Sequence, residues 1–410
     1  MIAAFIRFSI KYPGVIIGLA FIVIAYGLYQ IKQSPLNVFP EFSPTQVIIQ
    51  TESPGFSSSL VESLVTKPIE QAISGTIGIK QIRSQSIPGL SVVTIIFDED
   101  TDIYKNRQSI SERLSALRKK LPESTTPVLA PLTSSASSVL GIGITSKTKN
   151  LTDLRTIAET IIIPHLISTP GVAEVNRFGG LIKQFQVEIS PDKLYKHNIT
   201  IEQISDAISR ATSIIGGGFI ENDNQRIIIN TEGQSRTIDD IEIAPVANVN
   251  GQTIRIKDIA IVKEGYVPSI SAVSINGEPG VYLSVQGQLG SDTYKLTKQL
   301  ETSLNNLAPL IEKEEIQIHP DLFKPANFID ASINGLKIDI LIGAFLVISI
   351  LYLFLYNLKT ALISAVTIPL SLLSAISVMS HFNLGLNVMI LSGLAISLGE
   401  VVDDAIIDVE

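Results

Sequence analysis

The distribution of apolar residues constrains this chain more than any other feature. Residues 14–31 form a run of 18 without a charged side chain, and Arg7, Lys11 and Lys32 flank it. A helix of that length spans roughly the hydrocarbon core of a bilayer. The run is long for the apolar region of a signal peptide, and no small-residue cleavage motif follows it. The sequence therefore predicts an uncleaved membrane anchor near the N-terminus.

Three more apolar stretches follow near the other end, at residues 340–356, 361–379 and 384–402. Arg7 and Lys11 precede the first predicted span, and Lys359 lies in a short loop predicted on the same side. The positive-inside rule places these basic residues in the cytoplasm. In a bacterium the long polar segment 32–337 would then be periplasmic, and the chain a multi-pass protein of the inner membrane.

Composition excludes several classes of protein. The chain has no cysteine, which removes thiol catalysis and Cys-ligated metal sites. Its net charge of -8 argues against a nucleic-acid partner, while 45% hydrophobic and 17% charged residues agree with a membrane lipid environment. No enzyme and no cofactor are expected. No metal site is expected among the four histidines, which are scattered and lack an i, i+4 pair; they are His165, His197, His319 and His381. The residues that would bind a metal are therefore unknown.

The first part of the polar segment has the pattern of a split β-α-β unit. The predicted order is strand, helix, strand, strand, helix, strand, at residues 45–51, 57–73, 79–84, 90–97, 103–121 and 127–132. Pro88 and Gly89 mark the central turn. This βαββαβ order predicts a ferredoxin-like module.

The same order recurs after Ser134, with an interruption. The predicted elements are residues 139–145, 151–166 and 172–177, then 269–275, 281–286, 292–307 and 316–319. Residues 179–267 lie between the two groups and contain strands of their own and the run Gly216-Gly217-Gly218. An insertion in a repeated unit is the simplest explanation.

Acidic residues enter the last apolar stretch, at Glu400, Asp403, Asp404, Asp408 and Glu410. Carboxylates at membrane depth cost about 2.5 to 3.5 kcal/mol each on insertion scales, so they usually relay ions or protons. Residues 403 and 410 are seven apart and share one helix face. In the alternative interpretation the helix ends near Val402 and the acids are solvated. The apolar residues that continue between them, without Gly or Pro, favour the relay.

Several strings together resemble the N-terminal part of a resistance-nodulation-division (RND) efflux permease. They are SPLNVFPEFSPTQV (34–47), SQSIPGLSVVTIIF (84–97), TPGVAEVNRFGGLIKQFQVEI (169–189), IIGGGFIE (214–221) and VVDDAIIDVE (401–410). The string GVAEVN, followed by GG and KQFQV, is most like the heavy-metal branch. The chain stops inside or just after the last span, which suggests a fragment of a longer pump.

The resemblance implies an α-helical membrane protein with an α+β periplasmic domain and four transmembrane helices. It implies this division: 1–35, tail and first span; 36–133, first pore subdomain; 134–178 with 268–325, second pore subdomain; 179–267, inserted docking subdomain; 326–410, spans two to four. The partners implied are a homotrimer, a periplasmic adaptor protein and an outer-membrane channel.

The resemblance also assigns roles to residues. Asp403 falls on the proton-relay aspartate, Asp404 on its twin in the drug-exporting branch, and Glu410 on the glutamate of the V-E-N string. Ser397 departs from zinc- and cobalt-type members, which have an aspartate there. The implied activity is proton-driven export of divalent metal cations. The alternatives are export of amphiphilic drugs, or a membrane-tethered periplasmic binding or scaffold module.

Overall fold

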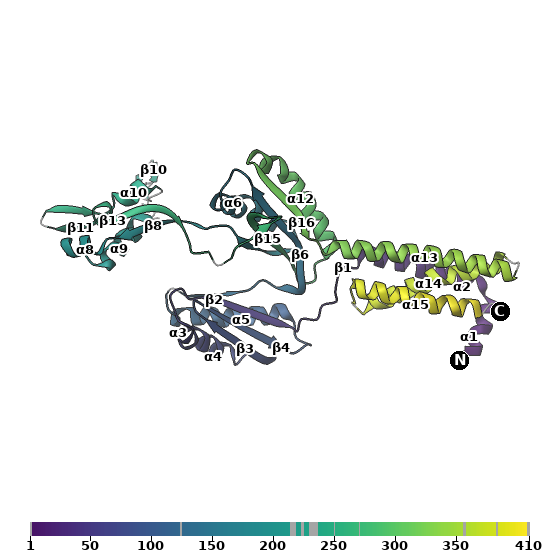
Figure 1. Cartoon of the computed structure of the whole chain (residues 1–410). Helices are drawn as coiled ribbons and strands as arrows, with labels where there is room; N and C mark the ends of the chain where they lie inside the picture. Colours follow the sequence, from purple (N-terminus) through teal and green to yellow (C-terminus); the bar gives the residue numbers. More distant parts are fainter. Residues whose placement is uncertain are drawn as a thin grey trace.

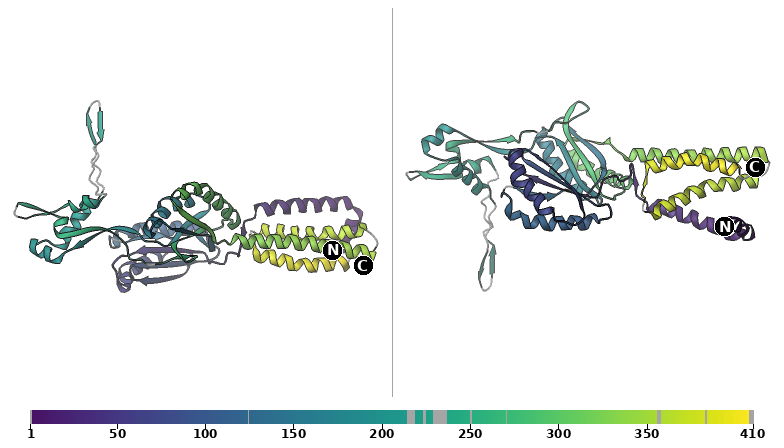
Figure 2. Two further views of the ribbon diagram at one scale, coloured as in Figure 1. Left: turned by 45° about the horizontal axis from the view of Figure 1, so that its top comes forward. Right: turned by 90° about the horizontal axis from the view of Figure 1, so that it is seen from below.

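The computed structural model consists of a helical bundle, two α+β modules at one end of it, and an arm that extends from the second module (Figure 1). It describes residues 2–123, 125–213, 219–222, 225–228, 237–249, 251–269, 271–355, 358–382 and 384–407. The bundle and the modules lie along one axis, with the arm at the end remote from the bundle (Figures 1 and 2).

The first module has the expected strand and helix order. Its elements are β2 (Gln46–Glu52), α3 (Ser58–Val61), η1 (Glu62–Thr66), α4 (Lys67–Ile73), β3 (Ile79–Ile87), β4 (Leu90–Phe97), α5 (Ile103–Leu117), η2 (Arg118–Lys120) and β5 (Thr126–Leu129). The sheet order is β3-β4-β2-β5, and every neighbouring pair is antiparallel. Alternate residues of β2 and β4, among them Val47, Ile49 and Ile95, form a core with the helices.

The second module repeats that arrangement. Its elements are β6 (Thr133–Ser146), α6 (Leu151–Ile157), η3 (Ala158–Ile162), α7 (Ile163–Ile167), β7 (Val172–Gly179), β14 (Ser274–Ile275), β15 (Glu278–Gln288), α12 (Thr293–Lys313) and β16 (Ile316–Phe323). The main sheet order is β7-β15-β6-β16. Leu140, Ile142 and Ile144 are buried against the helices, whereas Gly141 and Gly143 lie under Tyr282 and Leu322 on the other face. Gly141 and Gly143 therefore allow side chains to pack directly on the strand.

The strand predicted at residues 269–275 is wrong in extent, because among the described residues of this range the strand β14 covers Ser274–Ile275 alone. Asn276 and Gly277 form the turn into β15, and both have positive φ, as a two-residue hairpin requires. From Val281 onward the same edge of β15 pairs with β7. That leaves space for only a short partner, whose last contact is the Gly280 N–H donating to the Val273 carbonyl at 3.0 Å.

The insertion leaves the second module as a two-stranded antiparallel arm, β8 (Lys183–Ile189) with β13 (Ala260–Tyr266). Beyond it lie α8 (Pro191–His197), α9 (Ile201–Thr212), β9 (Phe219–Asn222), β10 (Gln225–Ile228), α10 (Ile238–Glu242), β11 (Pro245–Val249), β12 (Gln252–Arg255) and α11 (Ile256–Ile259). These elements have a core of their own around Ile204, Ile241 and Ile256. Gly216, Gly217 and Gly218 lie outside the described residues.

The bundle contains α1 (Ile2–Lys11), α2 (Pro13–Gln33), α13 (Ala326–Leu355), α14 (Leu358–His381) and α15 (Val388–Ile407). A short parallel ladder, β1 (Leu36–Asn37) with β17 (Leu386–Asn387), closes the end next to the modules. Helix α13 begins well before its apolar stretch, because Ala326 and Ile329 are buried and continue the helix outward.

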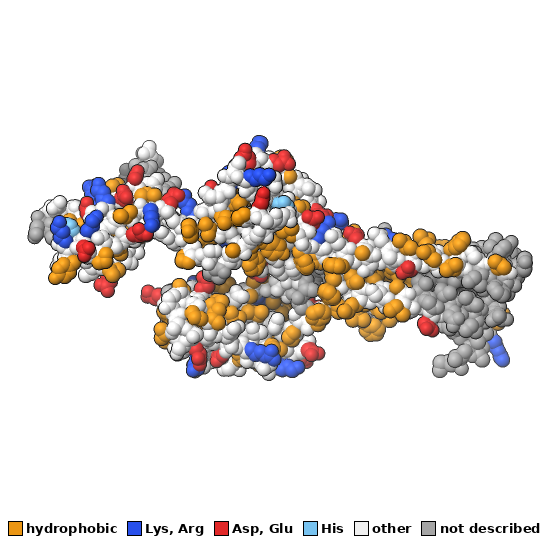
Figure 3. All heavy atoms as spheres, in the orientation of Figure 1, with side chains coloured by type: hydrophobic (Ala, Val, Ile, Leu, Met, Phe, Trp, Pro, Cys, Tyr) orange, Lys and Arg blue, Asp and Glu red, His pale blue; other side chains and the backbone are white. Residues whose placement is uncertain are grey.

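Hydrophobic side chains cover much of the described bundle surface, while the modules and the arm show a mixed surface (Figure 3). Among the described residues one helical segment, Pro13–Ile31, is long and apolar enough to cross a membrane. Two shorter apolar helical segments are Pro369–His381 and Val388–Ser397. The apolar surface of α2 is largely exposed, as a lipid-facing helix requires.

Candidate functional site

Helix α15 carries the acidic residues singled out in the sequence, and its first turn is firmly held. Asn387 caps it, since its Oδ1 accepts a hydrogen bond from the Ile390 N–H at 2.9 Å. Leu394 is buried with Leu372 and Ile376 of α14 in the core of the bundle. The helix contacts both α13 and α14. These contacts fix the orientation of its N-terminal half.

The helix continues through Asp403 and Asp404 to Ile407, past the possible end at Val402. The side chains of Asp403 and Asp404 are not among those described, and Asp408 and Glu410 lie outside the described residues. Glu400 is exposed in the isolated chain. At Ser397 the hydroxyl donates to the Leu394 carbonyl at 2.9 Å within the helix. The proton relay therefore stays a prediction that rests on residue type and helical position.

The end of the bundle is joined to the second module through Asn37. Its Oδ1 accepts hydrogen bonds from the N–H of Thr293 at 3.2 Å and from the Thr293 hydroxyl at 2.8 Å. Thr293 is the first residue of α12, and Asn37 ends β1. Local sequence patterns do not predict this contact, because 256 positions separate the two residues.

A cavity of about 640 Å³ opens beside this joint. Its lining comes from the segment after β1, the outer face of the second sheet and the start of α13. Aromatic side chains dominate it and a few polar groups converge on it; these are Phe39, Phe42, Phe323 and Phe328 with Ser137, Ser138 and Gln286. Such a lining suits an apolar or amphiphilic molecule better than a metal ion.

The polar groups of this cavity are linked to one another along the sheet. The Ser137 hydroxyl donates to Gln286 Oε1 at 2.6 Å, and Gln286 Nε2 donates to the Ser284 hydroxyl at 2.9 Å. Tyr282 lies in the same row, and burial raises the pKa of its phenol despite a hydrogen bond to Ser284. The row therefore presents neutral groups, without an ionised ligand for a cation.

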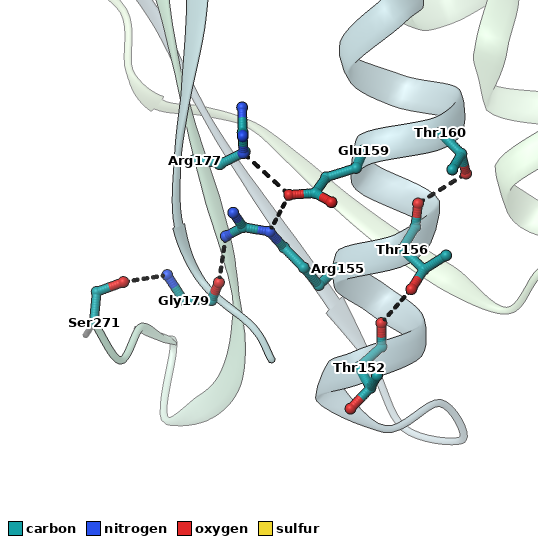
Figure 4. A network of polar contacts seen from close by, with 8 residues as sticks. All are labelled: Thr152, Arg155, Thr156, Glu159, Thr160, Arg177, Gly179 and Ser271. Carbon is teal, nitrogen blue, oxygen red and sulfur yellow. Dashed lines mark hydrogen bonds and ion pairs between the residues drawn. The ribbon is translucent and has the colours of Figure 1, made fainter. Parts of the chain in front are cut away.

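A second polar cluster marks the point where the arm leaves the module (Figure 4). Buried Arg155 donates from Nη1 to the Gly179 carbonyl at 2.8 Å and from Nε to Glu159 Oε1 at 2.7 Å. Arg177 also reaches Glu159, at 3.0 Å, and the Ser271 hydroxyl accepts from the Gly179 N–H. All these groups have partners, which indicates a structural joint.

Within the described part of the chain, no group of three or more His, Asp or Glu side chains could hold a metal ion. Two of the histidines have ordinary hydrogen bonds there, His165 with the Ser303 carbonyl and His319 with the Thr145 hydroxyl.

Comparison with known proteins places these features in a family. The model of the AcrB/AcrD/AcrF family matches residues 5–410. The chain belongs to the AcrB/AcrD/AcrF family. Its relatives include Protein HelA of Legionella pneumophila, 33% identical over 417 residues, and cobalt-zinc-cadmium resistance protein CzcA of Cupriavidus metallidurans, 30% identical over 422 residues. Each alignment covers 100% of this chain and 39% of the relative, so the chain spans well under half of their length.

Solved structures agree with this assignment to the AcrB/AcrD/AcrF family. The chain resembles a crystal structure of a heavy metal efflux pump with a TM-score of 0.82 and 30% identity, covering 98% of this chain and 40% of that one. The architecture is therefore that of an RND permease, and the expected resemblance to its heavy-metal branch is confirmed.

Proposed function

We propose that the full-length protein is an inner-membrane permease that uses the proton gradient to export divalent heavy-metal cations. The observation that carries this proposal is the similarity of the whole chain to a cation efflux protein and a cobalt-zinc-cadmium resistance protein, together with its match to the AcrB/AcrD/AcrF family. Transport, with no chemical conversion of the substrate, is the activity this supports.

In this proposal α2, α13, α14 and α15 cross the membrane, and Asp403, Asp404 and Glu410 relay protons. A carboxylate in a helix bundle can bind or release a proton as its charged neighbours change. The two modules act as the first and second pore subdomains, and the insertion as the docking subdomain. A homotrimer would pass the cation to a periplasmic adaptor protein and an outer-membrane channel.

Export of amphiphilic molecules is the second candidate, and one observation favours it. The aromatic cavity between β1, the second sheet and α13 offers an apolar surface with neutral hydroxyl and amide groups. The pair Asp403-Asp404, which resembles the drug-exporting branch, agrees with this alternative.

Cells that lack their own metal exporters and receive the full-length gene test both candidates. They should gain tolerance to zinc, cobalt or cadmium, and Asp403→Asn should abolish it at an unchanged membrane level, because the amide keeps the shape but cannot bind a proton. Asp408→Asn is the matched control and should have a mild effect, since residue 408 matches no relay position.

Tolerance to dyes and detergents without tolerance to any metal would instead support the second candidate, export of amphiphilic molecules. Full metal tolerance in a normally expressed Asp403→Asn protein would contradict the relay and favour acids that are simply solvated on the last turns of α15.

A further inference from the structure

We propose that Asn37 is a coupling residue, which transmits movement of α15 to the second module through the first turn of α12. The inference rests on the proposed function, because it assigns the route between the proposed proton relay and a pore subdomain. Asn37 itself binds neither proton nor metal in this role. It is a positioning residue that connects two elements.

The first link joins α15 to β1. β17 leads directly into α15 and pairs in parallel with β1, with Leu386 opposite Leu36 and Asn387 opposite Asn37. The Val388 N–H donates to the Val38 carbonyl at 3.2 Å. Leu386 and Asn387 are 3% and 4% exposed, so water cannot readily replace these contacts. A displacement of the first turn of α15 must therefore carry β1 with it or break the ladder.

The second link joins β1 to α12. An N–H group can only donate, so its bond to Asn37 fixes the amide with the oxygen toward Thr293. The first N–H groups of a helix have no partner inside it. Asp292 supplies one acceptor, to the Lys295 N–H at 2.8 Å, and Asn37 supplies another from outside the module. Asn37 thus caps the N-terminus of α12 from a distant segment of the same chain.

The third link joins α12 to the rest of the second module. Leu296, Leu300 and Leu304 are at most 5% exposed and lie in the module core. Close-packed interiors transmit displacement because they have little free volume. Movement received at Thr293 therefore shifts the module as one body, since α12 cannot move separately from its sheet.

Proteoliposomes containing the full-length pump provide the test, with zinc ion as the probe and an imposed pH gradient. Zinc transport and proton movement are recorded in the same vesicles. Asn37→Leu should slow zinc transport about tenfold, within the usual range of site-to-site coupling. It should also raise the number of protons moved per zinc ion. Asn37→Asp keeps the acceptor oxygen and should restore both values.

The matched control is Asn306→Leu, at an exposed position of the same helix, which should leave both values unchanged. A fall in zinc transport at a constant proton-to-zinc ratio would reveal only a loss of intact pumps and overturn the inference. Wild-type values in Asn37→Leu, or failure of Asn37→Asp to rescue, would overturn it as well. Wild-type vesicles that move no zinc would instead contradict the proposed function itself, and with it this inference.

Discussion

At the scale of single residues, two buried threonines of the first module have opposite hydrogen-bonding states. The Thr66 hydroxyl lies 2.8 Å from the hydroxyls of both Ser86 and Ser91. Thr51 of β2 is fully buried and pairs with Ser91 of β4. The Thr51 Oγ1 has no hydrogen-bond partner among the described residues. A buried hydroxyl without a partner loses its hydration without compensation. The two positions therefore contribute with opposite sign to stability.

Substitution by valine, which has nearly the same shape, should separate them. Thr51→Val should raise the free energy of unfolding of the first module by about 1 kcal/mol, because it removes an unpaired hydroxyl. Thr66→Val should lower it by about 2 kcal/mol, because it breaks two hydrogen bonds. Amide hydrogen exchange of β2 and β4 in the purified protein measures both changes. A fall in the free energy of unfolding on Thr51→Val, as on Thr66→Val, would contradict this account of Thr51.

At the scale of elements, the repeat of the two modules extends to a local irregularity. In the first module η1 is a π-helical turn that precedes Pro68, and in the second η3 is a π-helical turn that precedes Pro164. Proline lacks the N–H for the regular helical bond, and a wider turn accommodates it. The sequence predicts one helix at each place. In each module the helix does continue without a break through its own π-helical turn.

The joint at the base of the arm depends on Gly179, which has φ of 73°. A Cβ there would lie 2.7 Å from the Gly280 carbonyl oxygen and 2.8 Å from Val273 Cβ. Gly179→Ala should therefore destabilise the pairing of β7 with β15 by about 3 kcal/mol, from backbone strain and overlap together. Hydrogen exchange of the β7 amides is the measurement.

Gly277 offers the matched control, because its φ is also positive, 89°, yet a Cβ there meets nothing within 4 Å. Gly277→Ala should cost only the backbone strain, about 1 kcal/mol. A cost for Gly179→Ala no larger than this would show that the joint relaxes around an added methyl group.

At the scale of the whole molecule, local patterns predicted the elements but not their long-range contacts. The predicted strands and hairpins lie close to those observed. They are predicted from alternating apolar residues, such as Val47 and Ile49, and from the turn at Gly89. The contact of Asn37 with Thr293 and the cavity around Phe39 and Phe323 bring together distant segments. Hydrophobic periodicity does not predict such long-range contacts, because they form only when the modules pack against the bundle.

The predicted topology makes the strongest demand on the whole chain, and the absence of cysteine makes it testable. Single cysteines replace Lys11, Ile77, Lys359 or His381, in a full-length protein freed of any other cysteine. If α2, α13 and α14 each cross the membrane, the four positions alternate between cytoplasm and periplasm. In spheroplasts a membrane-impermeant maleimide should label Ile77→Cys and His381→Cys, and leave Lys11→Cys and Lys359→Cys unlabelled.

Labelling after lysis is the control, since every position should then react if its thiol is accessible. Ile77 is 94% exposed, so its cysteine sets the reference for full reaction. Labelling of Lys359→Cys in spheroplasts would show that α13 does not cross the membrane. Because α14 continues from Lys359 and α15 follows it, that result would also contradict the predicted direction of α15, and the proposed relay at Asp403 would lose its place near the cytoplasmic end of the bundle.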